Sequence, residues 1–139
     1  MKRAMSASLS EVEKVAESIA KSLPQSAVIF LRGDLAAGKT TLVKAIAKIK
    51  GCTEPVTSPT FSIEQVYDET LRHYDLYQCP NDKFIALGLL ESLESPGWHL
   101  VEWGDEALRE LLRGYGIFTA VVEIEKGDNK RIYRIETDA

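Results

Sequence analysis

An eight-residue glycine loop constrains the fold and the ligand of this chain more than any other feature of its sequence. The loop consists of Gly33, Asp34, Leu35, Ala36, Ala37, Gly38, Lys39 and Thr40 and fits the pattern G-x-x-x-x-G-K-[ST]. Glycines let the backbone wrap so that successive N–H groups point inward at phosphate. Lys39 would place an ammonium between the β- and γ-phosphates, and the Thr40 hydroxyl is a hard oxygen ligand for Mg²⁺. The loop therefore predicts a P-loop site for a nucleoside triphosphate with magnesium.

The segments on either side of the loop fit this interpretation. Residues 27–31 are apolar, with β-branched and aromatic members, which is typical of a buried parallel strand. From Thr41 to Lys50 the apolar residues recur at helical spacing, and Gly51 follows as a helix-stop signal. The positive end of that helix dipole would face the bound anion. Strand, glycine loop and helix is the order that a P-loop requires.

The rest of the chain alternates helical and extended patterns. Ser10 and Glu13 form a capping-box pattern before an apolar helical face that continues to Pro24. Extended runs at 60–67 and 71–77 could pair as an antiparallel hairpin. We further expect helices at 81–94 (with Phe84, Leu87, Leu90 and Ile85 as inward-facing candidates) and 105–113, a buried strand at 98–102, and strands at 117–125 and 130–136.

These patterns predict one α/β domain over residues 1–139, with residues 1–8 as a flexible tail. The expected architecture is P-loop NTPase-like, a three-layer α/β/α arrangement with a mixed, mostly parallel central sheet. The length of 139 residues fits a single core. We expect no repeats and no linkers.

The composition of the chain limits its expected binding partners and its expected cellular compartment. The formal net charge is −4 and the pI is about 5.3, which argues against a broad nucleic-acid-binding surface. Cys52 and Cys79 form neither a metal pattern nor a disulfide framework, which indicates a reducing compartment. No apolar stretch approaches the roughly 20 residues of a membrane span. We therefore expect a cytoplasmic protein with no membrane association.

A P-loop site also needs an acidic group near Mg²⁺ and a group that orients the attacking atom. Glu102 closes an apolar run at the position of a strand-end acid, and Asp75 lies among residues suited to burial. The segment Thr57, Ser58, Pro59 and Thr60 holds three hydroxyls and could act as a switch-like loop. Trp103 follows Glu102 and could stack on the nucleotide, on a partner or in the core. His73 and His99 show no zinc spacing and are interpreted as structural.

The residues alone leave several function classes open. A small-molecule kinase shares the P-loop but needs an acceptor pocket and usually an arginine-bearing lid, for which the chain leaves little room. A GTPase switch needs the motif N-K-x-D, which Asn81–Phe84 does not match. A nucleotide-gated assembly module with incidental hydrolysis is a third possibility.

Taken together, five motifs resemble one family. They are 33–42 (GDLAAGKTTL), 58–61 (SPTF), 73–77 (HYDLY), 87–88 (LG) and 102–103 (EW). In order and spacing this series resembles the TsaE (YjeE) family over roughly residues 8 to 136. The resemblance implies a bacterial ATPase subunit for threonylcarbamoyladenosine formation at A37 of tRNAs that read codons starting with A. It further implies ATP and Mg²⁺ as cofactors, TsaB and TsaD as partners, and indirect or weak tRNA contact. Because no arginine is obviously placed to act on the γ-phosphate in cis, we expect slow hydrolysis by the subunit alone and acceleration in the assembled complex.

The resemblance also implies roles for single residues. Lys39 becomes the phosphate lysine, and Thr40 becomes a magnesium ligand. Asp75 and Glu102 become the functional acids near the magnesium and the attacking water, with their division of labour open and Glu102 the candidate magnesium ligand. Trp103 falls beside the nucleotide.

The chain departs from the family pattern at three positions. Ala36 stands where the family usually has Gly, which would be strained if that backbone needs a positive φ. Gln78 replaces a usual Arg after the Asp-Leu-Tyr motif, and Asp105 replaces a usual Glu. None of these three departures falls on Lys39, Thr40, Asp75 or Glu102.

Overall fold

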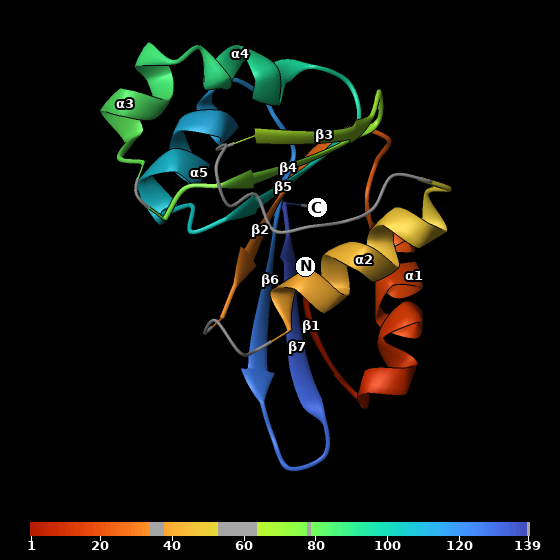
Figure 1. Ribbon diagram of the computed structural model, residues 1–139. Coiled ribbons are helices and arrows are strands. Elements are labelled where there is room, and N and C mark those ends of the chain that lie inside the picture. The colour runs from red at the N-terminus through yellow and green to blue at the C-terminus, as the bar shows by residue number, and fades with distance from the viewer. Residues whose placement is uncertain (34–37, 53–63, 78, 139) are drawn as a thin grey trace.

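A seven-stranded mixed sheet forms the centre of the protein (Figure 1). The computed structural model describes residues 1–33, 38–52, 64–77 and 79–138. The spatial strand order is β1-β7-β6-β2-β5-β4-β3. The strands are β1 (Lys2–Ala7), β2 (Ala27–Arg32), β3 (Glu64–Asp68), β4 (Leu71–Asp75), β5 (Trp98–Glu102), β6 (Thr119–Lys126) and β7 (Arg131–Thr137).

The four strands at the centre of the sheet run parallel, and the edges are antiparallel. β2 pairs in parallel with β5 and β6, and β5 pairs in parallel with β4. β3 and β1 pair antiparallel with β4 and β7, and β6 pairs antiparallel with β7. β2 and β5 are almost entirely buried, as expected for strands covered on both faces. The expected mixed sheet with a parallel centre is confirmed.

Helices cover both faces of the sheet. α1 (Val12–Ser22), preceded by the 3₁₀ turn η1 (Leu9–Glu11), and α2 (Lys39–Ile49) cover one face. α3 (Asn81–Ala86), α4 (Leu89–Glu94) and α5 (Glu106–Gly114) lie on the other side of the sheet in Figure 1. Each side has its own apolar core, because successive residues of β2 alternate between them: Ile29 packs with α1 and α2, whereas Phe30 packs with the other helices.

Three local expectations differ from the structure. Residues 2–7 form β1, which pairs with β7 over its whole length, where the sequence predicted a flexible tail. The capping box uses Ser8 and Glu11, whose carboxylate accepts from the Ser8 N–H at 3.0 Å, and not Ser10 and Glu13. The cap lies two residues before the predicted one because the 3₁₀ turn η1, and not α1 itself, follows Ser8.

The single helix predicted over 81–94 is two short helices. α3 ends before Gly88, which has φ 76°, and α4 starts directly after it. Phe84 is fully buried as predicted, but Ile85 and Leu87 are about half exposed. The predicted inward face assumed one continuous helix, and the left-handed backbone of Gly88 ends that helical spacing. Within the described ranges, no helix is both long and apolar enough to cross a membrane.

Gly97 makes a close backbone approach that a side chain would prevent. Its φ is 107°, and a Cβ atom there would lie 2.7 Å from the Thr70 Cα and carbonyl oxygen. The residue sits where β5 begins, beside the turn between β3 and β4, and its carbonyl accepts from the Ala27 N–H at 3.1 Å. Glycine at this position therefore lets the start of β5 pack between the β3–β4 turn and the start of β2.

Replacing Gly97 with Ala is expected to lower the free energy of unfolding by about 2–4 kcal/mol, from the left-handed backbone and the overlap with Thr70. Urea unfolding followed by circular dichroism measures it. Gly114→Ala, where a Cβ meets nothing within 4 Å, is the matched control and should change stability little. Equal stability of the two variants would contradict this account.

Candidate nucleotide site

The carboxyl ends of three parallel strands bring the predicted site residues to one edge of the sheet. In the strand register Leu31 lies opposite Glu102, and Glu102 lies opposite Asp75. The phosphate loop begins directly after β2, so it starts beside Glu102. In open α/β sheets this edge is where ligands bind.

The described part of the glycine loop has the backbone that the motif requires. Gly33 follows β2, and Gly38 is the N-cap of α2 with φ 102°, a conformation that favours glycine. Its carbonyl accepts from the Leu42 N–H at 3.1 Å, so the helix is hydrogen-bonded from its first turn. Thr40 and Thr41 follow Lys39 in that turn and are half buried. Asp34, Leu35, Ala36 and Ala37 lie outside the described residues, as do Thr57, Ser58, Pro59 and Thr60 of the switch-like loop, and Gln78.

Lys39 lies at the meeting point of the P-loop helix and the end of β5. Its side chain is only 4% exposed. The ammonium Nζ lies 3.8 Å from Glu102 Oε1 and 4.2 Å from the centre of the Trp103 ring. A cation over the indole face is attracted by the ring quadrupole. The lysine of the P-loop motif and the strand-end acid, identified separately in the sequence, are thus neighbours in the fold.

Glu102 is held from its other side by a histidine. Its Oε2 accepts from His73 Nε2 at 2.6 Å, and His73 is fully buried. His73 Nδ1 lies 3.0 Å from the hydroxyl of Tyr67, which also lies 3.2 Å from Gln65 Oε1. Burial, with the nearby charge of Glu102, raises the pKa of Tyr67 to about 12, so this hydroxyl keeps its proton at neutral pH. The chain of contacts fixes the orientation of the Glu102 carboxylate.

Asp75 occupies the matching strand end on β4. Its Oδ1 accepts from the Tyr77 N–H at 3.0 Å, a turn in which the side chain closes the end of the strand. Asp75 is half buried, whereas Glu102 is buried. Of the two acids, Glu102 is the one in ion-pair distance of Lys39.

Trp103 has an unusual backbone for a bulky residue. Its φ is 64°, in the left-handed region, and it is 41% exposed. The next residue, Gly104, has no room for a side chain, since a Cβ there would lie 2.6 Å from the Phe30 ring. The indole packs edge-on against Tyr77 with ring centres 5.0 Å apart. The turn therefore holds an aromatic ring over Lys39 while leaving part of it accessible.

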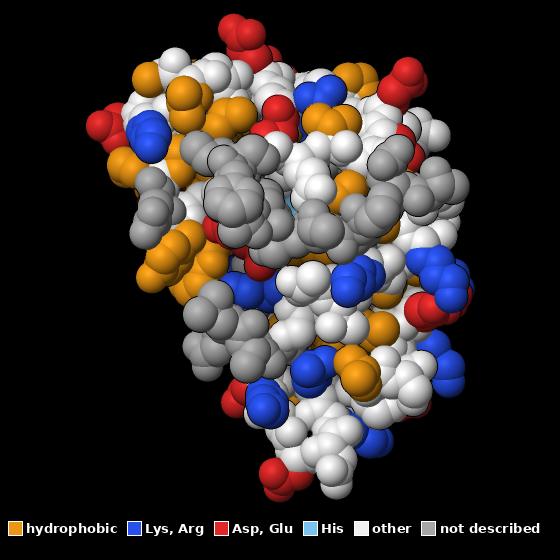
Figure 2. Space-filling view, viewed as in Figure 1, with side chains coloured by type: hydrophobic (Ala, Val, Ile, Leu, Met, Phe, Trp, Pro, Cys, Tyr) orange, Lys and Arg blue, Asp and Glu red, His pale blue; other side chains and the backbone are white. Residues whose placement is uncertain are grey.

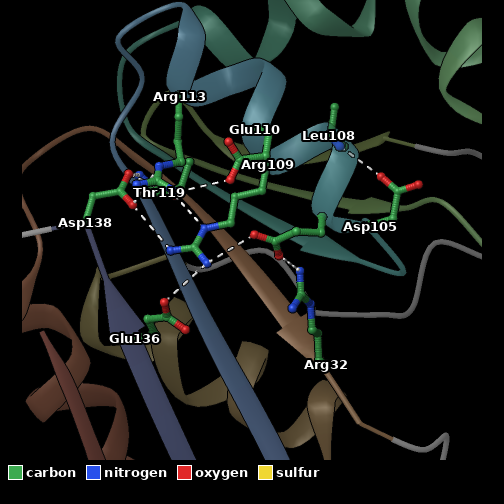
Figure 3. A network of polar contacts seen from close by, with 10 residues as sticks. Arg32, Asp105, Leu108, Arg109, Glu110, Arg113, Thr119, Glu136 and Asp138 are labelled. Atoms are coloured by element: carbon green, nitrogen blue, oxygen red, sulfur yellow. Dashed lines mark hydrogen bonds and ion pairs between the residues drawn. The ribbon is translucent and has the colours of Figure 1, made fainter.

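Three other charged residues have structural roles. Asp105 caps α5, its Oδ1 accepting from the Leu108 N–H at 2.9 Å (Figure 3). Aspartate suits this role better than glutamate, which gives a physical reason for the departure at this position. Arg32, which precedes the loop, pairs with Glu106 at 3.0 Å, and the buried Arg109 joins α5 to Thr119 and Asp138 (Figure 3).

The sequence missed the connection between the histidine and the acid. The sequence pattern indicates only a structural role for both histidines, but His73 is in direct contact with Glu102. His99 bonds to Tyr74 and to the Ser95 carbonyl, away from the loop. The order His-x-Asp on one strand carried a signal: residues two apart face the same side of a strand, so the histidine accompanies Asp75.

The donor atoms fit magnesium better than a softer metal. Among the described residues, no cluster of three or more His, Cys, Asp or Glu side chains could hold a metal ion. In a P-loop site Mg²⁺ takes a hydroxyl, one or two carboxylates, phosphate oxygens and water. Thr40 at the start of α2 and Glu102 at the end of β5 supply donors of that kind.

Fold and motif together define the class: a P-loop NTPase-like domain, with the glycine loop between β2 and α2 and an acid at the end of the neighbouring β5. The model of the family "Threonylcarbamoyl adenosine biosynthesis protein TsaE" matches residues 6–133. The chain belongs to the TsaE family, whose role is in the biosynthesis of tRNA threonylcarbamoyladenosine.

Individual relatives agree with the family assignment. A TsaE protein of Treponema pallidum (strain Nichols) is 35% identical over 112 residues, covering 78% of this chain and 83% of that protein. One from Rickettsia bellii (strain RML369-C) is 32% identical over 136 residues, covering 92% and 90%. A crystal structure of YdiB from Bacillus subtilis is 26% identical with a TM-score of 0.67, covering 100% of this chain and 88% of that one.

Replacing Tyr67 with Phe should remove the hydroxyl that lies against the buried His73 Nδ1. We expect the free energy of unfolding to fall by about 1–3 kcal/mol, as for other buried unsatisfied groups. Chemical denaturation measures it, and Tyr115→Phe, at a tyrosine that is 59% exposed, is the control. Unchanged stability in Tyr67→Phe would show that the hydroxyl does not support His73.

Proposed function

We propose that this protein is a Mg²⁺-dependent ATPase that supports tRNA threonylcarbamoyladenosine formation in the cytoplasm. On this proposal it acts on the TsaB–TsaD pair, does not transfer the threonylcarbamoyl group itself, and meets tRNA at most indirectly or weakly. Family membership supports the pathway, and the P-loop supports the nucleotide. Our proposal adds that the protein hydrolyses ATP, that it needs Mg²⁺ to do so, and that it acts on the TsaB–TsaD pair.

One observation carries the proposal of hydrolysis. The Lys39 ammonium lies 3.8 Å from a buried carboxylate, Glu102, whose orientation is fixed by His73. A protein that only bound nucleotide would need the loop and the lysine. An acid held rigidly beside that lysine is a feature of sites that position water or magnesium at the γ-phosphate. For the same reason we favour an ATPase over a nucleotide-gated assembly module with incidental hydrolysis.

We assign separate tasks to the two acids. Glu102, beside Lys39, would hold Mg²⁺ together with the Thr40 hydroxyl, and the bound metal would neutralise charge on the phosphates. Asp75, opposite Glu102 in the strand register and half buried, would orient the attacking water. Lys39 would keep its ammonium on the β- and γ-phosphates as the bond to the γ-phosphate breaks.

Hydrolysis by the protein alone should be slow. Arg32, the arginine nearest the loop in sequence, is engaged with Glu106, so it is not free to stabilise the transferred phosphoryl group. An arginine supplied by another protein is worth ~10³–10⁵ in rate for related P-loop enzymes. Exposed apolar side chains near the strand ends, Tyr77 and Trp103, offer a surface for such a partner.

The first prediction for this function concerns turnover. Phosphate release from ATP should be slow for the protein alone, should rise with the TsaB–TsaD pair, and should fall at least about 100-fold in Lys39→Ala, which removes charge stabilisation at the phosphates. Lys44→Ala, an exposed lysine of the same helix, should behave as wild type. Equal rates with and without the pair would contradict the proposed partners, and phosphate transfer to an added nucleoside would favour a kinase.

The second prediction separates Glu102 from Asp75. Glu102→Gln should raise the Mg²⁺ concentration needed for half-maximal turnover, because a neutral amide is a weaker magnesium ligand. Asp75→Asn should lower turnover by about 10²–10⁴-fold even at saturating Mg²⁺, the usual loss of a group that assists water. The reverse pattern would exchange their roles. Full tRNA modification by a variant that binds ATP without hydrolysing it would instead support the assembly module.

A further inference from the structure

An arginine from the far end of the chain lies against the glycine loop. Arg131 is the first residue of β7, after the turn that joins it to β6. A Cβ atom built on Gly38 would lie 2.8 Å from Arg131 Nη1, 2.9 Å from Cζ and 3.1 Å from Nε. Three atoms at similar distances mean that the guanidinium turns its flat face toward Gly38. The residue before the phosphate lysine is therefore in contact with a second cation.

The electrostatic surroundings of Arg131 differ from those of most other arginines. Arg32, Arg72, Arg109, Arg113 and Arg134 each have a carboxylate oxygen within 4 Å. Arg131 has none among the described residues. Its neighbour Tyr133 is buried and neutral: burial raises the pKa of this tyrosine, and the charge of Arg131 opposes the rise.

This cation stands where positive charge already accumulates. Gly38 caps the N-terminus of α2, the positive end of the helix dipole, and Lys39 follows it. The hollow beside Arg131, about 180 Å³, is lined by Leu9, Lys126, Gly127, Asn129, Lys130 and Arg131, without an acid among these residues. In the view of Figure 2, several Lys and Arg side chains lie around α2, with Asp and Glu side chains between them and at the β6–β7 end. An anion bound at the loop would lower the electrostatic repulsion between Arg131, Lys39 and the N-terminus of α2.

The strand order decides which part of the anion Arg131 meets. Glu102 and Asp75 come from β5 and β4, on one side of β2, and mark the γ-phosphate end where magnesium and water are needed. Arg131 comes from β7, beyond β6 on the opposite side of β2 (Figure 1). A nucleotide held by the loop between them would therefore present its α- and β-phosphates toward Arg131.

We propose that Arg131 is a ligand of the α- and β-phosphates, so that it strengthens the binding of ATP and ADP alike and takes no part in breaking the bond to the γ-phosphate. The inference rests on the proposed nucleotide function, which it extends to the β6–β7 hairpin. The guanidinium is suited to this task, since its fixed fork of N–H donors matches phosphate oxygens.

Titration calorimetry of Arg131→Ala with Mg·ATP and with Mg·ADP tests the proposal. Both dissociation constants should rise about 10- to 100-fold, the range for losing a charge-assisted hydrogen bond. Turnover at saturating ATP should stay within about threefold of wild type, because uniform binding does not change the chemical step. Arg131→Lys should recover part of the affinity for both nucleotides.

Arg134→Ala is the matched control. Arg134 lies on the same strand, on the opposite face, and pairs with Glu125 at 2.5 Å. The control removes the same charge and should leave both dissociation constants unchanged. If Arg131→Ala does not fold by its melting profile, Arg131→Gln keeps the side-chain length and replaces it.

The outcomes separate this inference from the function on which it rests. Unchanged dissociation constants in the Arg131 variant, with normal binding by wild type, would overturn the role of Arg131 alone. Weakened ATP binding with unchanged ADP binding would also overturn it, because the contact would then be to the γ-phosphate. Failure of the wild-type protein to bind either nucleotide would overturn both proposals together.

Discussion

The burial of the Glu102 carboxylate is the constraint on which the rest of the site depends. An ionised carboxylate removed from water is strongly unfavourable unless charge and hydrogen bonds compensate it. Here one oxygen faces the Lys39 ammonium and the other accepts from His73. Each partner is itself placed by a different element, Lys39 by α2 and His73 by β4. The acid can therefore keep its position only when three separately formed segments have come together.

The dependence extends to the edge of the sheet. His73 needs a partner for its second ring nitrogen, and Tyr67 on β3 supplies it. β3 pairs only with β4 among the described strands, and its ladder contains an irregularity between Val66 and Asp68. Tyr67 is nevertheless 4% exposed, so its side chain points into the core. The edge strand β3, which supplies neither the glycine loop nor either acid, thus contributes to the orientation of Glu102.

Local patterns in the sequence predicted the central elements of this arrangement because their signals are local. The glycine loop, the apolar strands beside it and the strand-end position of Glu102 can all be identified within a few residues. β1 could not be identified in this way, since Lys2–Ala7 contains no β-branched or aromatic residue and is a strand only through its pairing with β7. The contact of Arg131 with Gly38 joins residues 93 positions apart, and only the three-dimensional fold brings them together. The break at Gly88 had a visible local signal that the helical pattern outweighed.

The turn after β5 is strained, and the packing of the apolar core holds it in that conformation. Trp103 adopts a positive φ, which costs a non-glycine residue of order 1–2 kcal/mol. Gly104 lets the chain pass against Phe30 in the core, so the turn cannot relax without opening that contact. The strain is therefore maintained by the apolar core, and its effect is to keep an indole over Lys39. Strained backbone of this kind gathers at functional sites because the surrounding fold determines it. The ring thus shields a buried cation from the outer side while Glu102 compensates its charge from within.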